Sequence, residues 1–98
     1  MTSIQSKYEF VLVISTKLGD EGIAEMVQKF KELIEANATL ESVDEWGKRR
    51  LAYEIDFQSE GFYVLYTFTA KAEVPAEIDR ISNITDGILR SMVIKKED

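Results

Sequence analysis

Large apolar residues occupy every second position near the start of the chain, and between them lie Glu9, Val11 and Val13. The alternating residues are Tyr8, Phe10, Leu12 and Ile14. A two-residue period is the side-chain period of a β-strand. Since two of the three intervening residues are also apolar, the pattern predicts a strand over 8–14 that is mostly buried on both faces.

Apolar residues next recur at three- and four-residue spacing, which is typical of one face of an amphipathic helix. They are Ile23, Met26, Val27, Phe30, Leu33 and Ile34. Asp20 is the predicted N-cap, with Glu21 in the first turn, where a carboxylate is favourable. The helix is expected to end near Ala36 or Asn37 and to turn its apolar stripe toward a core.

The pattern is extended again from position 39, and two interpretations of its continuation remain open. A hairpin turn at 46–48 would divide the segment into two strands. Alternatively, one long strand carries a β-bulge at Gly47 and turns within the polar residues 58–61. A bulge shifts the alternation by one residue, so the sequence leaves the inward face undecided.

The last third of the chain predicts a strand, a helix and a strand. Residues 62–70 are rich in aromatic and β-branched residues, with Phe62 and Tyr63 beginning two opposite faces. Pro75 suits the first turn of a second helix, whose Ile78 and Ile81 face inward. A loop at 83–87 then leads to a final strand at 88–94.

The predicted order is strand, helix, strand, strand, helix, strand. With right-handed crossovers, this order gives an α+β, ferredoxin-like βαββαβ sandwich, with a four-stranded antiparallel sheet and both helices on one face. The first and third strands are then central. The segment 43–55 lies at a sheet edge, where unpaired backbone groups are available to a partner. Leu51, Tyr53 and Ile55 are expected to anchor one face of this strand to the core.

Composition excludes several classes of protein. At 98 residues, with 45% hydrophobic and 31% charged residues, the chain is expected to form one globular domain, residues 1–98. No apolar run approaches the roughly 20 residues of a membrane-spanning helix, and positions 1–7 lack the apolar segment of a secretory signal. The sequence therefore predicts a soluble, cytoplasmic protein without membrane contact.

The absence of histidine and cysteine removes most catalytic and metal chemistry. Disulfides and thiolate sites are excluded, and the usual general base and zinc ligand are missing. The acidic clusters lack calcium-loop spacing, and no glycine-rich phosphate loop is present. We therefore expect no enzyme activity, no cofactor and no metal.

The segment 43–55 carries the most distinctive residues of the chain. Lys48, Arg49 and Arg50 are adjacent cations two residues after Trp46, in a chain whose net charge is −6. Three neighbouring cations are commonly a solvated surface, but arginine also binds phosphates in a forked geometry, and an exposed indole can stack on a base. Tryptophan is equally often core or the centre of a protein interface, so its side stays undecided.

Four segments together resemble the bacterial small-subunit ribosomal protein number six over essentially the whole chain: YEFVLVIS, VDEWGKRRLAYEI, GFYVLYTF and ILRSMVIKKED. The resemblance implies a structural role in the small ribosomal subunit. The protein would bind the central domain of small-subunit ribosomal RNA together with small-subunit ribosomal protein number eighteen. It also implies one long edge strand bulged at Gly47.

The resemblance further implies which side chains contact the partners. The candidate RNA-binding residues are Lys7, Lys48, Arg49, Arg50, Arg90, Lys95 and Lys96. Trp46 is the candidate partner-binding residue. Because the chain is acidic, the partner protein is expected to supply much of the basic surface. The alternative hypothesis is a regulatory domain of the same fold that binds a small molecule on its uncovered sheet face.

Overall fold

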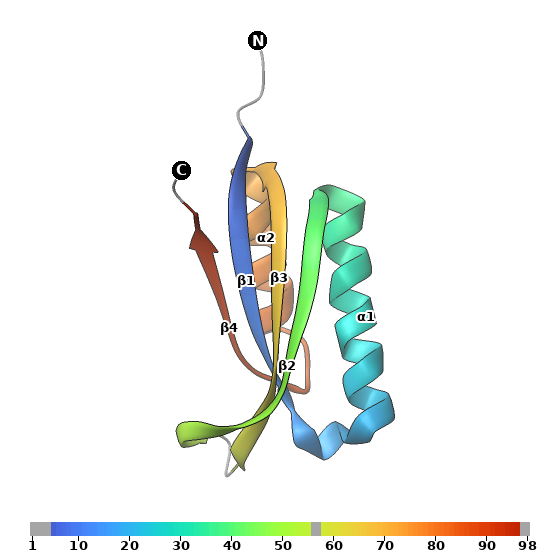
Figure 1. Ribbon diagram of the computed structural model, residues 1–98, viewed down its shortest axis with the longest axis vertical. Helices are drawn as coiled ribbons and strands as arrows, with labels where there is room; N and C mark the ends of the chain where they lie inside the picture. The colour runs from blue at the N-terminus through green and yellow to red at the C-terminus, as the bar shows by residue number, and fades with distance from the viewer. Residues whose placement is uncertain (1–4, 56–57, 97–98) are drawn as a thin grey trace.

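The computed structural model describes residues 5–55 and 58–96 of the chain. Its elements are strand β1 (Gln5–Ser15), a short 3-10 helix (Thr16–Leu18), helix α1 (Gly19–Asn37), strands β2 (Thr39–Ile55) and β3 (Gln58–Lys71), helix α2 (Glu73–Asn83) and strand β4 (Ile88–Lys95). The strands form one antiparallel sheet in the order β2-β3-β1-β4 (Figure 1). The predicted order, with the first and third strands in the centre, is confirmed.

Alternation in β1 and β3 separates the two faces of the sheet. Tyr8 pairs with Phe68 and Phe10 with Tyr66, so their side chains share one face. That face packs on both helices, and its core includes Phe30 of α1 and Ile78 of α2. The Tyr66 hydroxyl donates a hydrogen bond of 2.9 Å to the Val27 carbonyl, which ties β3 to α1. We call the opposite, helix-free face the open face.

Strand β2 resolves the alternatives for the middle of the chain. Residues 39–55 form one edge strand, with a register shift between Glu45 and Gly47, and Gly47 has a φ of 86°. A glycine in this conformation is typical of a bulge. The expected turn at 58–61 is wrong: Ile55 pairs with Gln58, so residues 58–61 belong to β3 and the connection is residues 56–57, outside the described part.

The predicted start of the first helix also needs a correction. Asp20 lies inside the first turn of α1, and the N-cap position is Leu18, which makes no side-chain cap. The chain enters α1 from the 3-10 helix, whose own cap is Ser15 with its hydroxyl accepting the Lys17 N–H at 3.2 Å. The predicted end of the helix at position 36 or 37 is confirmed by Asn37.

The far end of β2 departs from the expected anchoring in the core. Leu51 is buried, but it lies outside the core between sheet and helices. Tyr53 is 62% exposed. The cause is a further register shift between Arg50 and Ile55, beyond the bulge at Gly47. Each shift turns the following side chains relative to the pleat of β3, and the paired ends of β2 and β3 curl away from the helices (Figure 1).

Gly61 permits a close approach on the open face beneath this curled end. A Cβ at position 61 would lie 2.5 Å from the Val13 Cγ1 and 3.5 Å from the Leu51 Cδ2. Val13 and Leu51 are both buried, so an added methyl would have to displace packed side chains. The end of β2 can therefore pack this closely against β1 because Gly61 has no side chain.

We predict that Gly61→Ala destabilises the protein by about 1–3 kcal/mol, because the added methyl overpacks this contact. Urea unfolding followed by circular dichroism measures the change. Ser59→Ala, on the exposed part of the same strand, is the control and should change the free energy of unfolding by less than about 0.5 kcal/mol. An unchanged unfolding midpoint for Gly61→Ala would contradict the packing described for Val13 and Leu51.

Candidate nucleic-acid interface

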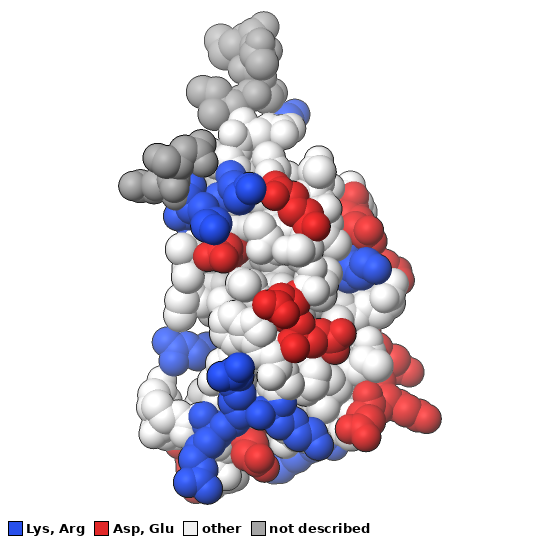
Figure 2. Space-filling view, in the orientation of Figure 1, with Lys and Arg blue, Asp and Glu red and all other residues white. Residues whose placement is uncertain are grey.

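The predicted RNA-binding residues form two groups at opposite ends of the sheet. One group, called here the basic end, is Lys48, Arg49, Arg50 and Arg90. The other is Lys7, Lys95 and Lys96. Arg49 pairs with Gly61, which pairs with Ser15, whereas Lys7 lies near the start of β1. Positions 7 and 15 of one strand are about 26 Å apart at roughly 3.3 Å per residue. Figure 2 shows both gatherings of cations, with acidic side chains between them.

The cation triplet does not form a single patch, because it lies on a strand. Lys48 pairs with Phe62 and extends toward the helices, where its Nζ is 4.0 Å from an Asp20 carboxylate oxygen. Arg49, one residue later, turns to the open face, and Arg50 turns back. All three are exposed. A ligand can therefore reach cations from both sides of the strand end.

Trp46 lies on the open face, which resolves its orientation. Its ring stacks near Tyr63, with centroids 6.3 Å apart and planes 14° from parallel. The indole Nε1 donates a hydrogen bond of 3.1 Å to Asp44. The guanidinium carbon of Arg49 lies 5.5 Å from the centroid of the indole, a cation–π distance. The residue is still 40% exposed.

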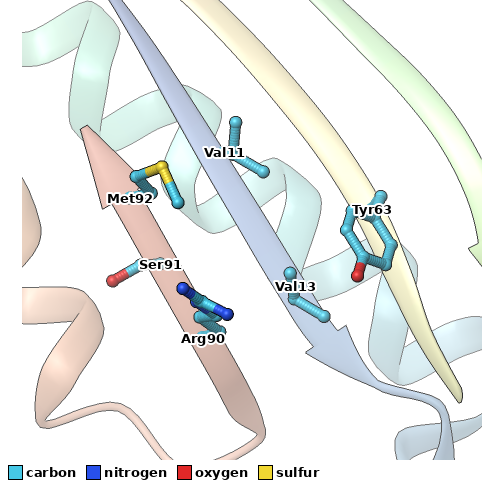
Figure 3. A pocket seen from close by; sticks show the side chains of 6 residues that line it. All are labelled: Val11, Val13, Tyr63, Arg90, Ser91 and Met92. Atoms are coloured by element: carbon cyan, nitrogen blue, oxygen red, sulfur yellow. The ribbon is translucent and has the colours of Figure 1, made fainter. Parts of the chain in front are cut away.

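Arg90 joins the same surface from β4. Its Nη1 donates a hydrogen bond of 3.2 Å to the Tyr53 hydroxyl, so the curled end of β2 reaches the strand at the other edge of the sheet. Arg90 and Tyr63 also line a shallow hollow of about 150 Å³ on the open face. Figure 3 shows this hollow between β3 and β4, with Val11, Val13 and Met92 as its apolar lining.

The arginines of the basic end differ in charge pairing from Lys7 and Lys96 at the other end of the sheet. Within residues 5–55 and 58–96, no carboxylate oxygen lies within 4.0 Å of Arg49, Arg50 or Arg90. At the other end, Lys7 pairs with Glu41 at 2.9 Å, and Lys96 lies 3.9 Å from Glu9. A ligand that binds these arginines therefore does not have to displace a carboxylate of the described residues.

Glu41 is held in its charged form by its neighbours. A hydrogen bond from the Thr69 hydroxyl, and then one from Lys7, lower the pKa of the Glu41 carboxyl below its ordinary value of 4.5. Glu41 lies at the register shift between Leu40 and Ser42, and its contacts bring it beside Lys7 and Thr69. A bulge in β2 thus positions the acidic partner of a predicted RNA-binding lysine.

Sequence reasoning missed two aromatic residues of this surface. Tyr63 is not among the candidate site residues, and Tyr53 was expected to anchor the edge strand. Alternation in β3 does place Tyr63 opposite Phe62, which was a usable signal. Its stacking on Trp46 and the contact of Tyr53 with Arg90 depend on the register shifts in β2, which no local pattern reveals.

Other kinds of site find no support in the described part of the chain. No three residues of the types His, Cys, Asp and Glu are grouped there in a way that could hold a metal ion. None of the described helices is long and apolar enough to cross a membrane.

Comparisons with known proteins agree on one family. The sequence model of the family described as ribosomal protein S6 matches residues 7–95. Small ribosomal subunit protein bS6 of Clostridium perfringens is 48% identical over 92 residues, 93% of this chain and 97% of that protein. The Clostridium botulinum protein of the same name is 49% identical, over 93% of this chain and 98% of that protein.

A solved structure confirms the fold. The crystal structure of 30S ribosomal protein S6 from Thermotoga maritima matches with a TM-score of 0.89, covering 95% of this chain and 89% of that chain. Its sequence is 24% identical, so this likeness concerns the fold alone. The predicted ferredoxin-like sandwich is therefore correct.

The Glu41 contacts predict a specific response to acid. A carboxyl whose folded-state pKa is lowered stabilises the protein above its ordinary pKa, and this stabilisation is lost as the pH falls through the folded value. We expect the difference in unfolding free energy between the unmodified protein and Glu41→Gln to shrink as the pH falls from 7 to below 4.5. Urea unfolding at each pH measures it.

Glu54→Gln is the control for this experiment, because it removes an exposed carboxylate from the same strand that has no ion pair among the described residues. A difference for Glu41→Gln that stayed constant from neutral to acidic pH would contradict the described contacts with Thr69 and Lys7.

Proposed function

The chain belongs to the ribosomal protein S6 family, and from this premise we propose that its basic end binds small-subunit ribosomal RNA while small-subunit ribosomal protein number eighteen lies beside it. Proteins of this family are components of the small ribosomal subunit and not enzymes. The resemblance inferred from the sequence, the structural role and the ribosomal, cytoplasmic location are therefore confirmed. The RNA contacts and the protein partner are the proposal.

The observation that supports RNA binding most strongly is the set of arginines at the basic end that have no carboxylate partner among the described residues. The chain carries a net charge of −6, so its summed field repels phosphate. Arg49, Arg50 and Arg90 nevertheless have no carboxylate within 4.0 Å in the described part of the chain. A phosphate bound at the basic end interacts mainly with these nearby arginines, because salt screens the charges of the chain that lie more than about 8–10 Å away.

The cations at the other end of the sheet have a secondary place in this proposal. Lys7 and Lys96 lie against Glu41 and Glu9, so a phosphate competes there with carboxylates of the protein itself. Lys95 is exposed and points toward the helix side, because it pairs with Tyr8. We propose that these three lysines contact RNA only after the basic end has fixed its position.

The open face supports a protein partner. Met92 and Ile94 are each 43% exposed on β4, and Val11 and Val13 of β1 line the hollow beside them with Met92. An apolar surface of this kind, rimmed by charged residues, is typical of a protein interaction site. A basic partner covering it would also offset the acidic charge of the chain.

The alternative, a regulatory domain that binds a small molecule, is not favoured. The hollow on the open face holds about 150 Å³, whereas pockets for drug-sized ligands hold about 300–1,000 Å³. Family membership also points to the ribosome.

We predict that replacing Lys48, Arg49 and Arg50 together by alanine weakens binding to the central domain of small-subunit ribosomal RNA. Each lost phosphate contact should lower the slope of log affinity against log salt by about 0.7–0.9. Filter binding from low to moderate salt, with and without ribosomal protein number eighteen, measures both effects. We expect a slope reduced by about 2 in either case.

The matched control replaces Lys17, Lys29 and Lys31 by alanine. It also removes three positive charges, but from the 3-10 helix and α1. If both triple variants bind equally well and have equal slopes, binding responds to net charge alone. That result would remove 48–50 from the proposed interface.

A further inference from the structure

Three contacts hold the Trp46 ring at a fixed place on the open face. Tyr63 stacks beside it, the Asp44 carboxylate accepts the hydrogen bond of its Nε1, and the Arg49 guanidinium lies against it. The indole nevertheless contributes nothing to the core between sheet and helices. A large ring that is ordered by its neighbours but left 40% exposed is prepared for a contact outside the chain.

The chemistry of these contacts restricts what the ring can recognise. The indole has a single hydrogen-bond donor, Nε1, and Asp44 already occupies it. What remains is an apolar aromatic surface extended by the planar guanidinium of Arg49. Both groups bind flat rings by stacking, an arrangement in which neither aims a hydrogen-bond donor at the edge of the stacked base.

The surrounding charge selects a nucleic acid over a protein as the occupant. Arg49, Arg50 and Arg90 lack carboxylate partners in the described part of the chain. A ligand that offers a flat ring every few ångströms beside a negative group fits this arrangement. Single-stranded RNA has that repeat, because each base is attached to a phosphate.

We infer that Trp46, Arg49 and Tyr63 form a stacking platform for an unpaired nucleobase of ribosomal RNA, an inference that rests on the proposed RNA-binding function. Arg90, on the same face, holds a phosphate beside that base. This assigns Trp46 to RNA, where the sequence resemblance suggested the protein partner. Stacking at this point tolerates any base, because every base has a flat face.

The first test uses the emission of Trp46, which is the only tryptophan of the chain. The full chain is titrated at low salt with the central domain of small-subunit ribosomal RNA, and separately with inorganic polyphosphate, which has the charges but no rings. Filter binding or calorimetry records binding in the same samples. We expect the RNA to quench the emission and polyphosphate to leave it nearly unchanged at equal occupancy.

The second test separates stacking from charge with matched variants. Trp46→Leu keeps an apolar side chain but removes the ring, and should weaken RNA binding by roughly 5- to 100-fold without changing the salt slope. Arg49→Lys keeps the charge but loses the planar group, and should weaken binding by about 5-fold. Arg80→Lys, on α2 and outside the basic end, is the control and should stay within about 2-fold.

The outcomes distinguish this inference from the function on which it rests. If RNA binds without changing the emission of the unmodified chain, and Trp46→Leu binds RNA as tightly, the stacking platform is wrong and the RNA-binding function stands. If the chain does not bind the RNA with or without its partner, both fail. If Trp46→Leu weakens capture of ribosomal protein number eighteen without RNA and leaves RNA affinity intact, the ring belongs to the protein interface and the inference is overturned.

Discussion

The pairing of β1 with β3 is the constraint on which the rest of the structure depends. The two strands stay in one unbroken register from Gln5 with Lys71 to Ser15 with Gly61. Because side chains alternate strictly along both strands, this register sends one set of aromatic rings into the helices and the other set to the open face. A slip of one residue would place Phe10 and Tyr66 on opposite faces of the sheet. Core and binding surface are thus two results of a single register.

Strand β2 is the contrasting case, since its pairing with β3 is interrupted three times, after Leu40, Glu45 and Arg50. A bulge locally disrupts the ladder, bends the strand and increases its twist, so each interruption weakens regular pairing but redirects nearby side chains. The first lies at Glu41, beside Lys7. The second brings Trp46 over Tyr63, and the third lets Tyr53 reach Arg90. The irregular strand therefore carries the binding residues, and the regular pair carries stability.

This division explains how much could be predicted from the sequence. The β1 alternation, the α1 stripe and the β3 alternation specify the elements and the faces, and all three agree with the structure. Residues past a bulge do not obey the local period, which is why Tyr53 and the turn at 58–61 were wrongly placed and Trp46 stayed undecided. Its contacts join Asp44, Arg49 and Tyr63, and only the three-dimensional register brings them together. The family resemblance supplied the bulge at Gly47, which periodicity had left open.

An acidic chain that binds an acidic polymer needs a local basic surface, although its net charge is negative. A carboxylate that lies farther than about 8–10 Å from the phosphates repels them little, because salt screens the interaction over that distance. Glu41 and Glu9 meet this condition, since they hold lysines toward the far end of the sheet, whereas Asp20 and Asp44 lie at the basic end, beside Lys48 and Trp46. Stacking adds attraction that salt does not screen. An aromatic ring among the arginines is therefore most useful in a protein whose net charge opposes binding, as it does here.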